Sequence, residues 1–429
     1  MSNVVPEGWA IETIGDIAFV KGGKRLPKGE TFSENKTEYP YIRVTDFKNG
    51  GIDQRDLRFV DESIRNKIKR YVISSNDLYI SIAGTLGLVG EVPNNLDGAL
   101  LTENAAKIVF KQQCQSNKSY FKYYLNSDEP QHSFNQAKGT GGGVPKLALF
   151  RIEETQTLLP PLPEQKKIAA ILTSVDEVIE KTQAQIDKLK DLKTAMMQEL
   201  LTCGVGVDGK PHTEFKDSPV GRIPKGWEVV ELDTLLNVME SGWSPQCETE
   251  KADSGDWCIL KTTAVSWDGF NYLANKKLPA SLEPRPEIQV KSNNILITRA
   301  GPADRVGVVS YVESVPEKVM LSDKIIRLTT KETIHESFLS FWLAGTFAQR
   351  FMANRISGLA SSQTNISQAI LKSIPCVVPS LTEQEIIVNS ITSVNNHLRV
   401  SIERLSSQQI LKKALMQDLL TGKVRVKVD

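Results

Sequence analysis

Three short segments resemble catalytic or phosphate-binding motifs, and each lacks a residue that its chemistry requires. The Pro-Pro sequence within 159–162 has neither the polar residue before it nor the aromatic residue after it that holds a flipped base. Residues 204–211, GVGVDGKP, have the spacing of a phosphate loop, but Pro211 replaces the hydroxyl residue that binds Mg²⁺. Glu164 and Lys166 have an E-x-K spacing without a preceding Pro-Asp, and a carboxylate there suits the start of a helix.

The histidines and cysteines do not have the spacing of metal ligands. The cysteines are odd in number and scattered, which favours reduced thiols in a bacterial or archaeal cytoplasm over a disulfide framework. We therefore expect no metal and no active site. The residues are His132, His212, His335, His397, Cys114, Cys203, Cys247, Cys258 and Cys376.

Basic residues gather in two segments of the first repeat, and both are candidates for DNA contact. The glycine-containing loop 20–30, VKGGKRLPKGE, suits phosphates, and Arg25 suits a guanine edge. The alternative is solvated surface charge, with Asp61 and Glu62 neutralising the second segment, 65–70. The candidates are Lys21, Lys24, Arg25, Lys28, Arg65, Lys67, Lys69 and Arg70, together with Arg43.

The corresponding loop of the second repeat, MESGWSPQCETE (239–250), is acidic and aromatic instead. Its Trp243, like Trp257 and Trp267, either packs in the core or presents an edge to a base. Arg299 and Arg305 flank a glycine-containing turn, and Ile82 stands where the second repeat has Arg299. Salt bridges from Asp304 to Arg305 or from Asp323 to Arg327 are the structural alternative. The candidates here are Trp243, Lys261, Arg299 and Arg305.

Composition excludes several classes of protein. The chain has 429 residues, 40% of them hydrophobic and 24% charged, which is typical of a soluble protein with two globular units. We find no apolar run of about 18 residues that would span a membrane, and no secretory signal. The net charge of +1 argues neither for nor against nucleic acid. DNA contact must therefore use local clusters or partner subunits.

The chain repeats itself with a period of about 219 residues. Short apolar runs bounded by Gly, Asn and Pro predict strands at 39–44, 77–82, 105–110, 294–298 and 324–328, with helices at 118–127 and 336–345. This is an α+β fold. The matched segments are 6–27 with 224–245, 42–45 with 260–263, 75–84 with 292–301, Val89-Gly90 with Val306-Gly307, 121–125 with 339–343, 158–175 with 377–394 and 196–202 with 415–421.

Each repeat ends in a long helix with apolar residues at steps of three and four. Such a stripe must be buried, either against the other helix or against its own domain. Polar breaks recur at Thr182 and Ser401 and at Lys193 and Lys412, where they would set register. Thr382 and Glu385 have capping-box spacing, and Gly204 and Gly422 suit the C-terminal caps. The seam residues are Ile168, Leu172, Val175, Ile179, Ile186, Leu189, Ile387, Ile391, Val394, Leu398, Leu405 and Leu415.

Several of the matched segments resemble the specificity subunits of type I restriction-modification enzymes. They are the PxGW sequences beginning at Pro6 and Pro224, the S-N and A-G strand-turns at 75–84 and 292–301, PPLPEQKKIAAIL (160–172) with SLTEQEIIVNSI (380–391), and MMQELLT with LMQDLLTG. One departure is that TGGGVPKLA (140–148) stands where the second repeat has SSQTNIS (361–367), with Pro145 and Lys146 replacing a polar pair.

The resemblance implies two target-recognition domains, each reading half of a bipartite, asymmetric double-stranded DNA target. It implies that the two helices pair antiparallel as a coiled-coil spacer on which two methyltransferase subunits dock. S-adenosylmethionine, ATP and Mg²⁺ would belong to partner subunits, which include restriction–translocation subunits in some systems. The alternatives are a self-contained methyltransferase or nuclease, and a coiled-coil adaptor that binds only protein.

We assign six segments on this basis. They are recognition domain 1 (1–158), the first long helix (159–204), a linker (205–222), recognition domain 2 (223–377), the second long helix (378–422) and a C-terminal tail (423–429).

Overall fold

The computed structural model describes residues 5–136, 145–247, 250–360 and 363–428. Within it the chain forms two compact units. Unit 1 comprises residues 1–184 and 403–429, and unit 2 comprises residues 185–402. The glycine-rich stretch 140–144 of the first repeat and residues 361–362 of the second lie outside the described residues.

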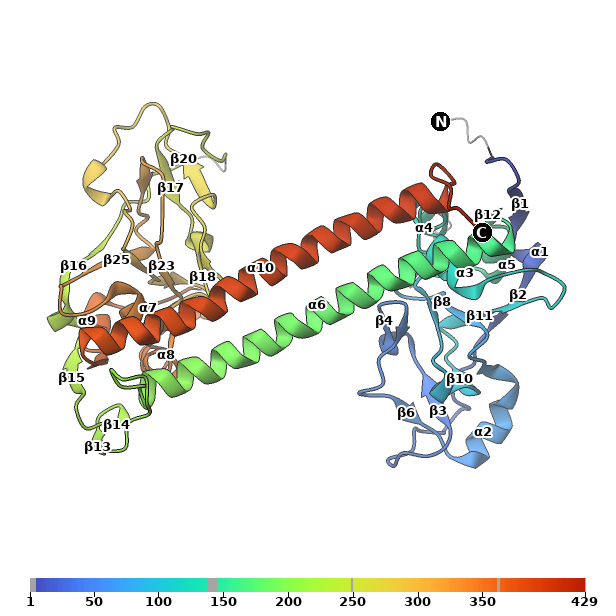
Figure 1. Cartoon of the computed structure of the whole chain (residues 1–429), viewed down its shortest axis with the longest axis horizontal. Helices are drawn as coiled ribbons and strands as arrows, with labels where there is room; N and C mark the ends of the chain where they lie inside the picture. Colours follow the sequence, from blue (N-terminus) through green and yellow to red (C-terminus); the bar gives the residue numbers. More distant parts are fainter. Residues whose placement is uncertain (1–4, 137–144, 248–249, 361–362, 429) are drawn as a thin grey trace. The chain divides into compact units, whose positions relative to one another are not determined.

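Unit 1 is built on two four-stranded sheets (Figure 1). One sheet has the order β2 (Ala18–Gly22), β11 (Ala105–Phe110), β8 (Leu78–Ser81) and β9 (Val89–Glu91), with antiparallel neighbours. The other has the order β6 (Arg58–Phe59), β3 (Pro40–Ile42), β10 (Ala99–Leu101) and β7 (Val72–Ile73). β1 (Ala10–Thr13) pairs with β12 (Gln156–Leu159), and β4 (Phe47–Lys48) forms a hairpin with β5 (Gly51–Ile52). The helices are α1 (Ile14–Ile17), α2 (Glu62–Ile68), α3 (Lys118–Leu125), α4 (Asp128–Gln136) and α5 (Leu149–Glu153).

Unit 2 repeats this plan. Its main sheet has the order β16 (Leu236–Ser241), β25 (Ile325–Thr330), β21 (Ile295–Thr298) and β23 (Val309–Tyr311). Smaller sheets are β20 (Asn275–Lys277), β17 (Cys258–Leu260) and β24 (Val319–Met320), then β22 (Ala300–Gly301), β27 (Gln363–Asn365) and β26 (Ser357–Ala360). The pairs are β13 (Phe215–Ser218) with β14 (Gly221–Pro224), β15 (Glu228–Glu231) with β28 (Pro375–Val378), and β18 (Val265–Ser266) with β19 (Gly269–Phe270). The helices are α7 (Glu336–Ala344), α8 (Thr346–Ala353) and α9 (Gln368–Lys372).

The predicted strands and helices are confirmed, but one predicted match between the repeats is wrong. Val89 pairs with Ile80, whereas in the equivalent strands Val309 pairs with Ile297. Val89 therefore corresponds to Val309 and not to Val306. The turn of unit 2 is three residues longer than that of unit 1, and Arg305 lies in this longer turn.

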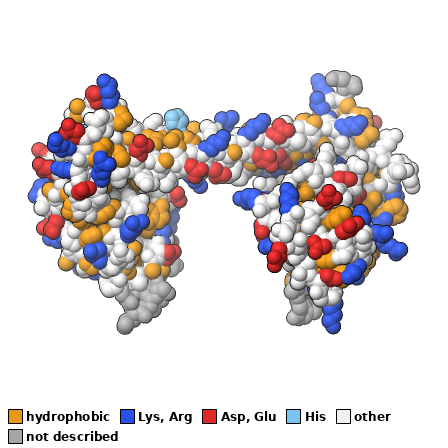
Figure 2. All heavy atoms as spheres, turned by 90° about the horizontal axis from the view of Figure 1, so that it is seen from below, with side chains coloured by type: hydrophobic (Ala, Val, Ile, Leu, Met, Phe, Trp, Pro, Cys, Tyr) orange, Lys and Arg blue, Asp and Glu red, His pale blue; other side chains and the backbone are white. Residues whose placement is uncertain are grey.

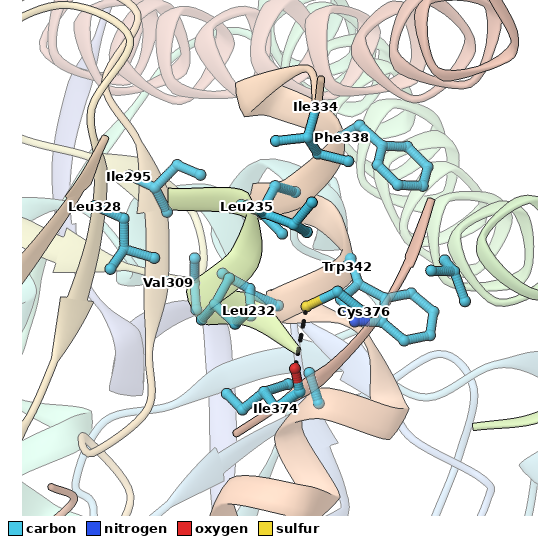
Figure 3. Close-up of a cluster of buried hydrophobic side chains, with 14 of the residues drawn as sticks. Leu232, Leu235, Ile295, Val309, Leu328, Ile334, Phe338, Trp342, Ile374 and Cys376 are labelled. Atoms are coloured by element: carbon cyan, nitrogen blue, oxygen red, sulfur yellow. Dashed lines mark hydrogen bonds between the residues drawn. The ribbon is translucent and has the colours of Figure 1, made fainter. Parts of the chain in front are cut away.

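Each unit has its own hydrophobic core. In unit 1 the fully buried aromatic side chains Tyr120 and Phe121 of α3 pack with Leu78 and Ile80 of β8. In unit 2 Phe338 and Trp342 of α7 belong to one buried cluster with Cys376, whose thiol donates to the Ile374 carbonyl (Figure 3). Burial raises the pKa of the Cys376 thiol well above its ordinary value, so this cysteine is a core residue.

The two long helices are α6 (Leu162–Thr202) and α10 (Leu381–Leu420), and each begins in one unit and ends in the other (Figure 1). Within unit 1 the pairs Asp176–Lys412 and Glu164–Arg425 join lower numbers on one segment to higher numbers on the other. The segments therefore run antiparallel there. Gly204 (φ 67°) and Gly422 (φ 69°) adopt the left-handed conformation just past the helix ends, as predicted.

The start of α10 differs from the prediction. Ser380, and not Thr382, accepts a hydrogen bond from a backbone N–H, that of Glu383 (3.3 Å). Thr382 already lies inside the helix, so the predicted Thr382–Glu385 capping box is wrong. Sequence spacing alone favours both pairs, and the first helical turn decides between them.

The predicted seam residues fall into two groups. Ile168 and Leu172 join the core of unit 1, and Ile387 and Ile391 join that of unit 2, so the first turns of each helix are core elements. Ile186, Val394 and Leu398 are also buried, as are the polar breaks Thr182 and Ser401. The remaining seam residues, Val175, Ile179, Leu189, Leu405 and Leu415, are half-buried.

Candidate nucleic-acid interface

The two basic segments of the first repeat lie against each other in unit 1. The ammonium group of Lys67 on α2 is 2.5 Å from the carboxylate of Glu30 in the loop, and the Lys24 ammonium lies 5.7 Å from the Tyr71 ring. The Tyr41 hydroxyl donates to the Lys24 carbonyl at 2.7 Å. We call the basic residues of these two segments together the basic face. They are Lys21, Lys24, Arg25, Lys28, Arg65, Lys67, Lys69 and Arg70.

The basic face is partly neutralised, by carboxylates other than the two expected. Arg25, whose side chain is 78% exposed, lies 2.7 Å from Glu103, and Glu30 takes the place expected for Asp61 and Glu62. Hydrogen bonding to Glu103 raises the pKa of Arg25. Lys21, Lys28, Lys69 and Arg70 are exposed, and Arg65 lies 5.6 Å from the Tyr39 ring. Exposed cations over aromatic rings suit a nucleic-acid surface.

In both units a glycine fixes the point at which the loop after the first strand of the main sheet, β2 or β16, leaves that strand. A Cβ on Gly23 would lie 2.1 Å from the Thr102 carbonyl oxygen, and one on Gly242 would lie even closer to the Leu321 carbonyl oxygen. Only glycine fits such an approach to a neighbouring backbone. The two loops therefore start from the same backbone geometry and differ in their side chains.

Arg43 is a structural residue in this fold. Its guanidinium binds the buried Asp46 carboxylate at 2.7 Å and also reaches Asp56. Hydrogen bonding to Asp46 raises the pKa of Arg43. Lys261, its counterpart in unit 2, is partly exposed, and Ala264 replaces Asp46 there. The two candidates at this matched position therefore have different surroundings.

The unit 2 candidates also separate by environment. Trp243 packs against a core cluster, with the Arg285 guanidinium 4.0 Å from its ring, and Trp257 is partly buried in the same cluster. Trp267, by contrast, is half exposed. Arg299 is partly buried, and its backbone pairs with Ile366.

Among the described residues, neither salt bridge that was the structural alternative in unit 2 is formed. Arg305 donates to the carbonyls of Thr262 (3.1 Å) and Val265 (2.9 Å) instead of pairing with Asp304. Arg327 pairs with Glu240 across neighbouring strands, while the Asp323 carboxylate accepts from Ser244. For both arginines, a partner distant in the sequence takes the place of the carboxylate nearby in the sequence.

Two buried carboxylates explain the repeated PxGW and EQ sequences, which the sequence reading did not recognise as partners. The indole of Trp9 donates to Glu164 at 3.2 Å, and that of Trp227 donates to Glu383 at 2.9 Å. The neighbouring glutamines, Gln165 and Gln384, bind backbone groups in the same way in both units. The signal was available, since both partners recur in both repeats.

Each of these carboxylates also holds the chain that follows the other long helix. Arg425, after α10, donates to Glu164. After α6, Glu383 accepts from the backbone N–H groups of Val205 (3.1 Å) and Gly206 (3.2 Å) and lies 2.8 Å from the His212 ring. We call these two arrangements the carboxylate locks.

The carboxylate locks give a structural role to the two segments that resemble an E-x-K motif and a phosphate loop, 164–166 and 204–211. Burial works to raise the pKa of Glu383, but donation from His212, Trp227 and the two backbone N–H groups outweighs it and holds the pKa below its ordinary value. The Glu383 carboxylate therefore binds groups of unit 2 itself, namely the His212 ring, the Trp227 indole and two backbone N–H groups. In the segment that imitates a phosphate loop, Val205 and Gly206 bind this carboxylate.

A lysine at the equivalent place on each long helix has different partners in the two units. Lys412 lies 2.6 Å from Asp176, which also accepts from the Tyr123 hydroxyl at 2.8 Å. Unit 2 has Asn395 and Phe341 at the places of Asp176 and Tyr123. There burial lowers the pKa of Lys193, and the charge of Asp268 opposes that shift.

The described residues contain no group of three or more His, Cys, Asp or Glu side chains that could hold a metal ion. In the same part of the chain, no helix has the length and apolar character needed to cross a membrane. On the face seen in Figure 2, Lys and Arg side chains alternate with Asp and Glu on both units.

Two α+β units with the same frame, matched loop exits and unlike loops define a duplicated recognition protein. Residues 6–191 and 224–411 match the type I restriction modification DNA specificity domain family. The chain therefore belongs to that family and is a specificity subunit with two recognition domains. The resemblance and fold class inferred from the motifs are confirmed.

One relative and one solved structure match nearly the whole length of the chain, and a second relative matches part of it. The chain is 29% identical over 429 residues to the type I restriction enzyme MjaVIII specificity subunit of Methanocaldococcus jannaschii, covering 99% of this chain and 94% of the relative. It is 39% identical over 171 residues to the EcoEI specificity subunit of Escherichia coli, which covers 39% of this chain and 29% of the relative. The crystal structure of a type I restriction-modification S subunit from M. genitalium has the same fold, with a TM-score of 0.63, 16% identity and 98% of each chain covered.

Proposed function

We propose that this subunit reads a bipartite, asymmetric double-stranded DNA target, one half with each unit, and contributes no catalytic group. The observation that carries the proposal is a shared frame with unlike loops. The carboxylate locks and the loop exits at Gly23 and Gly242 recur in both units, whereas one loop is basic and the other is acidic and aromatic. Two domains that recognise different DNA sequences need a shared framework with different loops.

The basic face supplies the phosphate contacts of unit 1. Lysines and arginines that neutralise phosphates give affinity, and Arg25 has the exposure needed to reach a guanine edge. In unit 2 the corresponding loop is acidic, so that unit relies more on base contacts and on partner subunits for the phosphates. Arg299 remains a candidate contact there.

The long helices set the gap between the half-targets and dock two methyltransferase subunits. With 41 and 40 residues they are about 60 Å long at ~1.5 Å per residue. Leu192 and Leu411 occupy equivalent places and expose 46% and 53% of their surface. A surface that is repeated suits two copies of the same partner, and exposed leucines suit the apolar core of a protein interface.

Catalysis and its cofactors belong to the partners in this proposal. S-adenosylmethionine lies in the methyltransferase subunits, and ATP and Mg²⁺ lie in restriction–translocation subunits where the system has them. The assembly works in the cytoplasm of a bacterium or archaeon. Support comes from the segments that imitate catalytic motifs, because Glu164, Val205 and Gly206 take part in the carboxylate locks.

The test is to map methylated sites in cells that carry this chain with its methyltransferase subunits. Exchanging residues 1–158 for the first domain of another family member should change one half of the target only, and exchanging 223–377 should change the other half. Inserting seven residues into both helices, at 184/185 and at 402/403, keeps the seam in register. That insertion adds about 10 Å and should lengthen the gap by about three base pairs. A single exchange that alters both halves would refute the proposal.

A further inference from the structure

The two units contain an equivalent β-hairpin whose tips differ. The β4–β5 hairpin of unit 1 turns through Asn49 (φ 52°) and Gly50 (φ 72°), the residues that a tight hairpin turn favours. The β18–β19 hairpin of unit 2 turns through Trp267 and Asp268 at the same places. Trp267 exposes 50% of its surface. Its indole therefore keeps about half of its surface available for contact with a ligand.

The hairpins are also held by different side chains. In unit 1 the Tyr79 ring stacks on Phe47 at 3.8 Å between ring centres, and its hydroxyl donates to the Gly51 carbonyl at 2.6 Å. Leu296 replaces Tyr79 in unit 2. There Arg305, from the longer turn, donates to the carbonyls of Thr262 and Val265 at the base of the hairpin.

Ser310 completes the support of the unit 2 hairpin. Its hydroxyl donates to the Ser266 carbonyl at 2.8 Å and accepts from the Ser266 N–H at 3.1 Å. The residue before Trp267 is therefore fixed through both of its backbone groups. A fixed backbone gives the indole a set direction before any ligand binds, which lowers the entropy cost of binding.

The exposed indole lines an open pocket of about 410 Å³. Val306, Met352 and Ile356 provide apolar lining, and Asp304 and Arg350 provide opposite charges. A carboxylate accepts from cytosine or adenine amino groups, and a guanidinium donates to guanine. Because Asp304 lies in this lining beside the indole, the surface suits base edges better than phosphates.

We propose that Trp267 is the residue through which unit 2 contacts the bases of its half-target, and that Arg305 is the positioning residue that holds its hairpin. This inference rests on the proposed function. Two copies of one methyltransferase subunit would meet the same surface on both units, as Leu192 and Leu411 provide. The hairpin tips carry different residues, which favours ligands that differ, and the two halves of the DNA target are such ligands.

The test uses the full chain assembled with its methyltransferase subunits. Affinity is measured for the cognate duplex and for duplexes in which one or the other half-target is scrambled. Trp267→Ala should weaken cognate binding at least 10-fold, in line with the loss of an aromatic–base contact. It should also abolish discrimination in the unit 2 half, which the domain exchange identifies, and leave the other half unchanged. The matched variant Asn49→Ala, at the other tip, should not affect the unit 2 half.

A direct contact can be recorded separately. Duplexes carrying 5-iodouracil at successive positions of the unit 2 half should crosslink to the peptide that contains Trp267. Arg305→Met should weaken binding and speed hydrogen exchange in residues 265–270, and Arg305→Lys should restore part of both. The double variant with Trp267→Ala should bind no worse than Trp267→Ala alone, because Arg305 acts through Trp267.

Four results would overturn the inference. They are unchanged affinity and discrimination in Trp267→Ala, crosslinks that avoid residues 265–270, additive losses in the double variant, and loss of methyltransferase assembly in Trp267→Ala, which would make the pocket a protein-docking site. If the wild-type complex itself shows no sequence preference, the proposed function fails and this inference fails with it.

Discussion

Unit 1 and unit 2 share the backbone framework that positions their loops and hairpins, but the side chains on those loops and hairpins differ. Glycine brings the loop against a neighbouring carbonyl in both, yet one loop continues with Lys24 and Arg25 and the other with Trp243. The hairpins occupy the same place, yet one ends in Asn49–Gly50 and the other in Trp267–Asp268. Repeated residues therefore encode geometry, while specificity lies in the residues that are not repeated.

The two carboxylate locks have the same arrangement, but we expect them to contribute differently to stability. This difference allows the comparison between the units to be tested. Glu383 accepts from two backbone N–H groups, an indole and His212, all within unit 2. Glu164 accepts from an indole and from Arg425, whose side chain is 41% exposed. A partly exposed arginine returns to water more easily than buried backbone groups do.

The largest expected effect is therefore at Glu383. Glu383→Ala leaves buried donors unpaired and should cost about 3–5 kcal/mol of unfolding free energy in unit 2, whereas Glu164→Ala should cost about 2–3 kcal/mol in unit 1. Urea-dependent hydrogen exchange, followed separately at residues 205–228 and 5–12, measures both. Glu385→Ala, an exposed neighbour on α10, is the control and should change stability by less than about 0.5 kcal/mol.

The same lock should respond to acid. Because the folded pKa of Glu383 lies below its ordinary value, its stabilisation is complete above the ordinary carboxyl range and is lost as pH falls through the folded pKa. Glu383→Gln should remove this part of the acid dependence of unit 2. Equal costs at Glu383 and Glu164, or no change in acid dependence, would mean that the two locks are equivalent.

A smaller effect is expected where the lysines differ. Asp176→Ala removes the ion-pair partner of Lys412 and leaves the Tyr123 hydroxyl with Thr173 alone, and it should destabilise unit 1 by about 1–2 kcal/mol. Lys193→Met should be neutral or stabilising by about 1 kcal/mol, because burial already disfavours the charge of Lys193. Thermal melting with local hydrogen exchange checks both variants. A costly Lys193→Met would show that Asp268 binds Lys193 as firmly as Asp176 binds Lys412.

The smallest effect is on DNA binding by single cations of unit 1. Lys24→Ala should weaken binding by the assembled complex alike for all sequences and should reduce the salt dependence by about one counterion. Arg43→Ala should leave the salt dependence unchanged and lower the stability of unit 1, because Arg43 is bound to Asp46. Binding titrations across salt, together with melting curves, separate these roles. The opposite pattern would place Arg43, and not Lys24, at the DNA.

Periodicity and repetition predicted much of the fold. The strand at 105–110 and the helix at 336–345 follow from local patterns of apolar residues, and the long helices follow from their stripes. The placement of Val89 was wrong because a three-residue insertion is invisible until strand pairing fixes the register. The choice between Ser380 and Thr382 as the cap depended on one turn of backbone geometry.

The candidate site was less predictable, since it depends on contacts between distant residues. Nothing near Arg305 in the sequence indicates that its guanidinium binds the carbonyls of Thr262 and Val265. Lys67 lies beside Glu30 only because the fold joins two segments far apart in the chain. Residue type indicated which side chains suit DNA. The tertiary structure decides which of these side chains are free to contact DNA and which are bound to other residues.

The way the long helices divide between the units has a consequence for the order of synthesis. Unit 1 contains the first residues of the chain but also Leu419, Leu420 and Arg425 from far downstream. On the ribosome its core therefore keeps an uncovered apolar face while all of unit 2 is translated. Unit 2 has every one of its parts once residue 402 has emerged. Although domains generally fold in the order in which they are made, here the second unit is the first that can finish.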